Sequence, residues 1–136
     1  MLLKVRAASL SILLSVSLSV SAFEDEDYSS AYNQCMDKAD GVTIPMVECA
    51  MAEFQRQDTL LNQNYKAALK TLAPEKQKQL REIQRLWIQF RDAECSFYGN
   101  LTGGSIDRIT SSSCMMEITK ARADDLGALA ESQESN

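Results

Sequence analysis

The sequence predicts an all-α fold, a small four-helix domain made of two antiparallel helical hairpins, each stapled by a disulfide. Only two prolines and five glycines interrupt the 136 residues, and we assign them to the joints between helices. Between these joints, apolar residues recur at three- and four-residue spacing, which is typical of amphipathic helices. Four cysteines, Cys35, Cys49, Cys95 and Cys114, flank two glycine-containing turns. This arrangement favours cross-links between neighbouring helices.

The N-terminus has the three-part layout of a secretory signal peptide. Two basic residues precede an apolar run over residues 7–20, and the small-residue site Val20-Ser21-Ala22 follows. The run of about 14 residues is shorter than the roughly 20 that a membrane-spanning helix needs, so a retained anchor is the less favoured alternative. We therefore expect a signal peptide over residues 1–22 and a single helical domain over residues 23–136 with a polar C-terminal tail.

The mature chain is acidic. Loss of Lys4 and Arg6 leaves 12 basic against 19 acidic residues, a net charge of about −7. Nucleic acid is an unsuitable partner for such a chain. The acidic surface serves either solubility alone or attraction of a cationic protein. With no cysteine at the new N-terminus to accept a lipid, we expect a periplasmic or secreted protein with no membrane span after cleavage.

The cysteines are expected to be structural. An even number in an exported chain indicates disulfides, and the sequence has neither a C-x-x-C pair nor a histidine to support a metal or redox site. Cys35 and Cys49 lie symmetrically about Val42, and Cys95 and Cys114 lie nearly symmetrically about residues 103–105. Residues equidistant from a hairpin loop lie at the same level, so we expect Cys35–Cys49 and Cys95–Cys114 bonds. Each would contribute about 3 kcal/mol on the chain-entropy model.

The first two helices follow from turn and cap signals. The first is expected over residues 28–38, after the acidic run at 24–27, whose charge suits a helix N-terminus, and before Gly41. The second begins after Thr43 as N-cap, with Pro45 in the first turn. Its inward stripe is expected to comprise Val47, Met51, Phe54, Leu61, Tyr65, Ala68 and Leu72.

The third helix begins at Pro74 and continues to Tyr98-Gly99. Its helical period is marked by Leu80, Ile83, Trp87, Phe90 and Phe97. We expect Trp87 and Phe90 to anchor the core, with an exposed aromatic binding patch as the alternative for Trp87. The fourth helix begins between Ser105 and Ser112. Its inward face is expected to carry Ile118, Arg122, Leu126 and Leu129.

Two polar features stand out. Asp58 interrupts the apolar stripe of the second helix, where a charge needs a partner, and Arg91 is the expected partner of Asp58 or Glu53. A functional carboxylate is the alternative for Asp58. Residues 101–105 form a flexible loop beside a disulfide, either a connector or a contact with a partner. Asn100-Leu101-Thr102 within this region matches the glycosylation sequon, and we treat it as loop.

In order and spacing, several motifs together resemble the LprI-type lysozyme inhibitor family of exported bacterial proteins. The motifs are Cys35, Met46-x-x-Cys49-x-x-x-Glu53, Asp58-x-x-Leu61-Asn62-x-x-Tyr65, Gln84-x-x-Trp87-x-x-Phe90-Arg91-Asp92-x-x-Cys95, Gly103-Gly104-Ser105 and Cys114-x-x-x-x-Thr119-x-x-Arg122-x-x-x-Leu126. The resemblance implies a helical, disulfide-bonded periplasmic or surface protein that inhibits lysozyme. The motif residues expected to be structural are Glu53, Asp58, Asn62, Tyr65, Trp87, Arg91, Asp92 and Arg122.

Three functions are compared. A binding inhibitor would occlude the cleft in which the two carboxylates of lysozyme cleave peptidoglycan, and acids such as Glu117, Asp124 and Asp125 would attract a basic enzyme. The alternative is an envelope interaction or immunity protein that binds another protein. An enzyme is disfavoured because only carboxylate pairs, Glu53 with Asp58 or Asp92 with Glu94, remain for chemistry. We therefore predict a protein partner and no catalytic residues, metal or cofactor, and leave the binding surface and oligomeric state unassigned.

Overall fold

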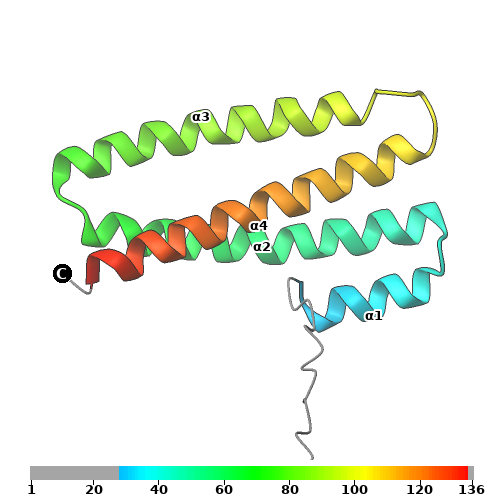
Figure 1. The fold of residues 1–136 in the computed structure, drawn as a ribbon, viewed down its shortest axis with the longest axis horizontal. Helices are drawn as coiled ribbons and strands as arrows, with labels where there is room; N and C mark the ends of the chain where they lie inside the picture. Colours follow the sequence, from blue (N-terminus) through cyan, green and yellow to red (C-terminus); the bar gives the residue numbers. More distant parts are fainter. Residues whose placement is uncertain (1–27, 135–136) are drawn as a thin grey trace, which may run out of the picture.

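The computed structural model describes residues 28–134 as four helices joined by short turns (Figure 1). They are α1 (Ser30–Ala39), α2 (Thr43–Thr71), α3 (Pro74–Tyr98) and α4 (Ile106–Glu134). This part of the chain contains no strand, and none of its helices is long and apolar enough to cross a membrane. The expected signal peptide, the acidic run at 24–27 and the last two residues of the tail lie outside the described residues.

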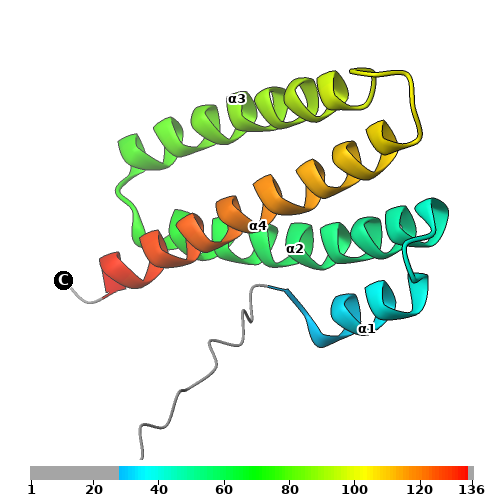
Figure 2. The same cartoon turned by 45° about the vertical axis from the view of Figure 1, so that its right-hand side comes forward.

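The helices form two antiparallel hairpins, as the sequence predicts. Figures 1 and 2 show α3, α4, α2 and α1 following one another across the molecule. Helix α4 packs against both α2 and α3, and α1 packs against α2. Because consecutive helices reverse direction, the pair with the most extensive contact, α2 and α4, runs parallel (Figure 1). Packing between helices of different hairpins therefore joins the two halves.

Both predicted disulfides are present. Cys35 of α1 is bonded to Cys49 of α2, with Cα atoms 5.6 Å apart, and Cys95 of α3 is bonded to Cys114 of α4, with Cα atoms 5.5 Å apart. Each bond thus lies within one hairpin. The structure contains no free cysteine among the described residues.

The core lies where α2, α3 and α4 meet. Its buried members are Leu61, Ala68, Leu80, Ala123, Leu126 and Ala130. Trp87, Tyr65 and Leu72 are partly buried against this cluster, as the sequence predicts for an inward face. Three of the six buried members are alanine, and such small side chains let the α2 and α4 backbones approach closely.

Gly127 marks this close approach. The prediction that every glycine lies at a joint is wrong for Gly127, which lies inside α4. A Cβ added there would lie 2.9 Å from Asn64 Nδ2, the atom that donates a 2.8 Å hydrogen bond from α2 to the Ala123 carbonyl. The position is glycine because the Asn64 side chain occupies the space that a methyl group would fill.

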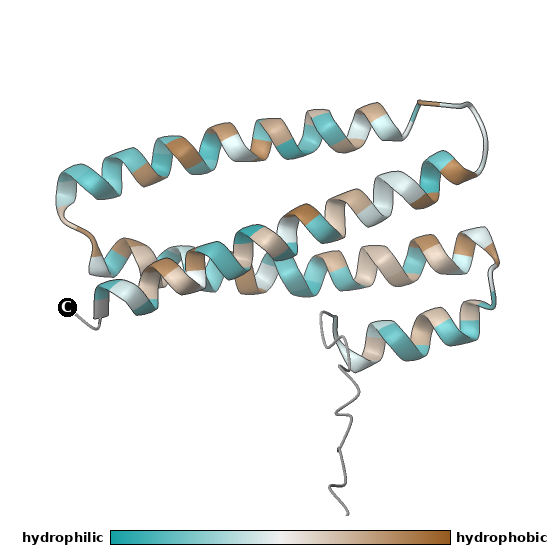
Figure 3. Cartoon of the chain, viewed as in Figure 1, coloured by the Kyte–Doolittle hydropathy of each residue, from teal (hydrophilic) through white to brown (hydrophobic). Residues whose placement is uncertain are grey.

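The inward face of α3 differs from the prediction. Phe90 was expected to anchor the core but is 55% exposed, and Phe97 and Ile83 are 61% and 51% exposed. The buried residues of α3 are Leu80, Gln84, Arg91 and Cys95. The Cys95 bond to α4 fixes this face, and the apolar residues that recur along α3 in Figure 3 lie partly on its outer side.

Smaller corrections concern helix ends and exposure. Helix α1 begins at Ser30, not at Tyr28, because Ser29 is its N-cap and accepts from the Tyr32 N–H. Thr43 is the first residue of α2, and Val42 occupies the N-cap position without a side-chain cap.

Within α2, Met51 is 36% exposed and not part of the core. In α4 the expected Leu126 is buried, whereas Ile118, Arg122 and Leu129 are half-buried, and Met116, Thr119 and Ala123 are the deeper residues.

Glu53 attaches the N-terminus of α1 to α2. Its fully buried carboxylate accepts hydrogen bonds from Ser29 N (3.2 Å), Ser29 Oγ (2.6 Å), Arg56 Nε (2.7 Å) and Gln57 Nε2 (2.8 Å). Burial alone would raise its pKa, but these donors prevail and lower the pKa of Glu53 to about 2. Arg91, the alternative partner for Glu53, does not supply any of these bonds. The expected ion pair of Glu53 is made instead by Arg56.

Substitution of Gly127 tests the α2–α4 contact. In an Asn64→Ala background, Gly127→Ala is expected to raise the free energy of unfolding by about 0.5–1 kcal/mol, through helix propensity. In the wild-type background this gain should vanish or reverse, because the new methyl group displaces the Asn64 amide from Ala123. Urea unfolding of the four proteins gives the coupling energy, expected at about 1–2 kcal/mol. Equal stabilisation in both backgrounds would contradict the contact.

Substitution of Glu53 tests the attachment of α1. Glu53→Gln is expected to lower the free energy of unfolding by about 2 kcal/mol at pH 7, since hydrogen bonds to a charged group are lost. The folded pKa lies below the unfolded one, so the wild-type advantage is complete above about pH 5 and disappears as pH falls toward 2. Urea unfolding between pH 2 and 7 measures this. The exposed Glu48→Gln variant is the charge-matched control on α2, and a pH-independent difference between wild type and Glu53→Gln would refute the assignment.

Candidate functional site

A groove of about 320 Å³ lies between α2 and α3. Its α2 wall is formed by Asp58, Leu61, Asn62 and Tyr65. Its α3 wall is formed by Arg81, Gln84, Arg85, Trp87, Ile88 and Arg91. Five of the eight residues that the sequence assigned to the family motif therefore meet here, from two helices that are separated along most of their length by α4 (Figure 1).

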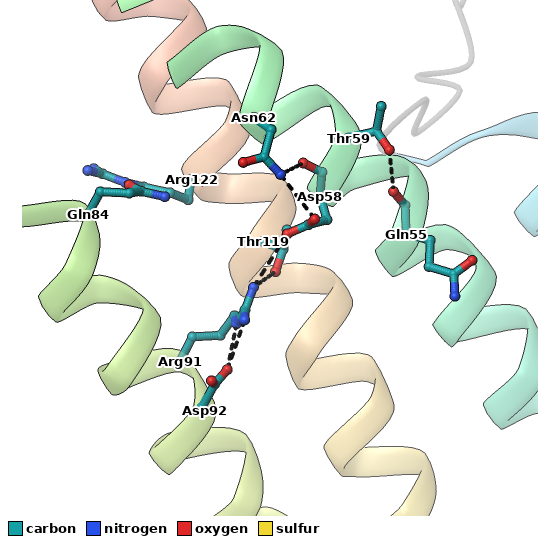
Figure 4. A network of polar contacts seen from close by, with 9 residues as sticks. All are labelled: Gln55, Asp58, Thr59, Asn62, Gln84, Arg91, Asp92, Thr119 and Arg122. Atoms are coloured by element: carbon teal, nitrogen blue, oxygen red, sulfur yellow. Dashed lines mark hydrogen bonds and ion pairs between the residues drawn. The ribbon is translucent and has the colours of Figure 1, made fainter. Parts of the chain in front are cut away.

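Arg91 links three helices at one end of the groove (Figure 4). Its Nη1 lies 3.7 Å from Asp58 Oδ1 of α2 and 3.5 Å from Thr119 Oγ1 of α4. Its Nε and Nη2 donate to Asp92 Oδ1 at 3.0 and 2.9 Å. The predicted pair of Arg91 with Asp58 is therefore present. Because an arginine fork holds several acceptors in one plane, Arg91 orients the two walls relative to α4.

The Arg91 guanidinium also lies against aromatic rings. Its Cζ is 5.1 Å from the Trp87 ring centroid and 5.4 Å from that of Phe54. Both distances fall within the range of cation–π contacts. The buried charge of Arg91 is therefore stabilised by the carboxylates of Asp58 and Asp92 and by these two rings. These contacts explain how α3 can bury an arginine.

Asn62 orients the carboxylate on the opposite wall. Its Nδ2 donates to Asp58 Oδ2 at 3.1 Å and to the Asp58 carbonyl at 2.8 Å (Figure 4). Asp58 is only half-buried, so its pairing with Arg91 is partly screened by water. The carboxylate thus remains at the groove surface with one side directed toward Arg91.

Arg122 and Gln84 form a second polar pair between α4 and α3. Arg122 Nε donates a 3.0 Å hydrogen bond to Gln84 Oε1, and the two side chains lie alongside each other in Figure 4. Burial lowers the pKa of Arg122, opposed by the nearby Asp125 carboxylate. No acceptor within residues 28–134 reaches the buried Arg122 Nη2 atom. Behind the wall that carries Gln84, the Arg122 guanidinium therefore has one N–H group without an acceptor in this part of the chain.

The remaining motif residues lie elsewhere or at the margin. Glu53 is at the α1–α2 contact described above, and Asp92 is an exposed acceptor for Arg91 outside the groove. Sequence reasoning did not single out Arg81, Arg85 or Ile88. Counting back from Cys95 in helical steps of three and four reaches Arg91, Ile88 and Gln84, and this count could have identified the α3 wall.

The loop between α3 and α4 is held more firmly than a flexible joint would be. The buried Asp107 carboxylate accepts from Thr102 N, Thr102 Oγ1 and Gly103 N at 2.7 to 3.2 Å. The side-chain bond from Thr102 lowers the pKa of Asp107 against the effect of burial, with help from the two backbone bonds. Sequence reasoning overlooked Asp107, although an acid shortly after two glycines is a common turn signal.

The side chains that line the groove determine which chemistry it can support. Among residues 28–134 there is no group of three or more cysteine, aspartate or glutamate side chains that could hold a metal ion. Asp58 has no second carboxylate beside it on the groove wall to act as an acid–base partner. The arginines, amides and aromatic rings that line it are suited to bind an anionic or peptide-like group.

The comparisons with known proteins concern the same helices. The family model described as "Lysozyme inhibitor LprI" matches residues 35–126. The chain is 30% identical over 101 residues to a Rhizobium meliloti (strain 1021) protein described as "Uncharacterized protein R02472", a match that covers 64% of this chain and 73% of that protein. No solved structure matches the chain. The matched region includes both disulfides and every groove residue, and the chain belongs to the LprI lysozyme inhibitor family.

Proposed function

We propose that this chain is an exported, non-enzymatic binding protein that blocks lysozyme or a related peptidoglycan-cleaving enzyme. The observation that carries the proposal is the family match over residues 35–126. Two disulfides support export, because such bonds persist in oxidising compartments, and we place the protein in the periplasm or outside the cell.

The rigidity of the domain suits an inhibitor. A disulfide and a buried carboxylate attach α1 to α2, and a second disulfide attaches α3 to α4. A surface that is already ordered loses little conformational entropy on binding, so more of the contact energy contributes to affinity. The fold thus presents a preorganised outer surface to an enzyme.

Charge supports a basic target. The chain has a net charge of −5 at pH 7, and α4 carries the exposed carboxylates Glu117, Asp124 and Asp125. Such a field accelerates encounter with a cationic enzyme and weakens as salt screens it. Lysozymes of basic isoelectric point are therefore the first targets to test.

We place the loop at residues 101–105 against the cleft of the enzyme. The loop lies at one end of the molecule beside the Cys95–Cys114 bond (Figure 1), Leu101 in it is 53% exposed, and Asp107 orders its backbone. An ordered loop with an exposed apolar side chain can fill a cleft at small entropic expense. Occlusion of the cleft would keep peptidoglycan from the two carboxylates that cleave it.

An assay of peptidoglycan lysis tests the proposed function. Purified protein is expected to suppress lysis by a basic lysozyme at near-stoichiometric amounts, with weaker suppression at 0.5 M than at 0.05 M salt. A peptidoglycan amidase, which does not use the lysozyme cleft, serves as the control and should be unaffected. Unchanged lysis at tenfold molar excess would refute inhibition, and equal suppression of the amidase would show that the protein coats the substrate instead.

Substitution of Leu101 tests the contact. Leu101→Ala is expected to raise the inhibition constant at least tenfold, because the apolar side chain that enters the cleft is lost. Leu60→Ala on α2 is the matched control, since Leu60 is also exposed, at 39%, and lies far along the chain from the loop. An unchanged inhibition constant for Leu101→Ala, measured by the same lysis assay, would place the contact on another surface.

A further inference from the structure

We propose that the groove between α2 and α3 binds a peptide-like ligand through its carboxylate. This binding site is separate from the loop at residues 101–105, and the inference does not depend on lysozyme inhibition. It rests on the charge of the groove, on the partners its arginines have, on its apolar lining and on its size.

The charge of the groove is opposite to that of the protein. Its lining includes three guanidinium groups, Arg81, Arg85 and Arg91, and one carboxylate, Asp58, whereas the whole chain has a net charge of −5. Acids outside the lining pair with Arg85 and Arg91, so Arg81 carries the positive charge that no carboxylate within residues 28–134 offsets. A positive site on an acidic protein attracts an anion locally while the rest of the surface repels it.

The arginines retain capacity for an anion. Arg81 Nη2 donates to the neutral Gln77 Oε1 at 3.2 Å, and within residues 28–134 no carboxylate pairs with it. Arg85 pairs only with Glu82, and both of these side chains are more than half exposed, so exchange for another carboxylate has a small energetic effect. A guanidinium group can bind a carboxylate through two parallel hydrogen bonds, and the side chains of Arg81 and Arg85 are exposed to make them.

The rest of the lining fits the organic part of such a ligand. Leu61, Tyr65, Trp87 and Ile88 provide apolar surface beside the arginines. Asp58 on the opposite wall offers a hydrogen-bond acceptor to an amide N–H of a peptide-like ligand, a donor that inorganic phosphate does not have.

The size of the groove limits the ligand. A volume of about 320 Å³ is at the lower end of ligand sites and corresponds to roughly ten water molecules. One or two amino-acid residues with a carboxylate fit this space. The ligand class that the groove selects is therefore a short acylated peptide that carries a carboxylate, either its C-terminus or an acidic side chain.

Calorimetric titration tests this proposal with defined probes. N-acetyl-alanyl-alanine represents a free C-terminus. N-acetyl-glutamate α-amide, whose only carboxylate is that of the side chain, represents an acidic side chain. N-acetyl-alanyl-alanine amide has no carboxylate. We expect at least one of the two carboxylate probes to bind at least tenfold more tightly than the amide, and the tighter one identifies the source. A perturbed indole N–H signal in proton NMR would locate the ligand, because Trp87 is the only tryptophan of the chain.

Paired charge variants provide the control. Arg81→Gln with Arg85→Gln is expected to weaken the tighter carboxylate probe at least tenfold. Lys76→Gln with Lys78→Gln removes the same charge from the same helix outside the groove and should change binding less than twofold. Circular dichroism and urea unfolding verify that each variant is folded, and these exposed positions are expected to tolerate the change.

Four results would overturn the proposal. They are absence of binding by both carboxylate probes at millimolar concentration, equal binding of the amide, binding of inorganic phosphate as tight as that of the carboxylates, and equal loss of binding in the two paired variants. None of these measurements contains lysozyme, so a negative result for the groove would not affect the test of lysozyme inhibition.

Discussion

The close packing of α4 against α2 determines the remainder of the structure. Small residues at this contact, Ala68, Ala123 and Gly127, bring the two backbones together, and Asn64 bonds directly to the α4 backbone. Helix α3 is then attached to α4 by the Cys95–Cys114 bond, so its position is set from one side. Because α4 takes up most of the contact with α2, a groove remains between α2 and α3. That groove is lined by side chains that a tighter bundle would bury.

Arg91 shows how the fold accommodates the polar face that results. The disulfide turns Gln84 and Arg91 of α3 inward, where an uncompensated charge would be destabilising. Asp92, Asp58, Thr119 and two aromatic rings supply the compensation from all three long helices. The same side chains that stabilise α3 in this orientation form one end of the groove. Structure and binding capacity therefore share residues, and substitution of Arg91 would affect both, which is why the exposed Arg81 and Arg85 are better probes of binding.

Much of the fold was predictable because its signals are local. Proline and glycine positions gave the helix joints, and symmetry about two turns gave both disulfide pairs. The face of α3 was not predicted correctly, since Ile83, Phe90 and Phe97 form as regular an apolar series as a buried stripe would. The position of Cys95 was the better guide to the inward face of α3, because its bond to α4 orients the helix whatever the hydropathy of its other residues.

The groove was less accessible to sequence reasoning for a related reason. The pair of Asp58 and Arg91 was expected. Arg81 and Arg85, however, have the pattern of ordinary surface charges on an amphipathic helix. Whether Arg122 Nη2 finds an acceptor depends on the residues packed around it, which its own helix does not reveal. Gly127 was misassigned similarly, because only the Asn64 side chain on another helix explains it. Features that depend on two helices at once have no signature in either one.

The distribution of charge separates two surfaces that a single net value conceals. Carboxylates at Glu117, Asp124 and Asp125 are exposed on α4, whereas guanidinium groups line the groove between α2 and α3. A basic protein would be attracted to the first surface and repelled locally by the second, and a small carboxylate would show the reverse preference. On the two proposals made above, one rigid domain would hold two ligands of opposite charge on different residues. Added salt should weaken both interactions, so ionic strength does not distinguish the two sites. Substitution of Arg81 and Arg85 does distinguish them, because only binding in the groove depends on these residues.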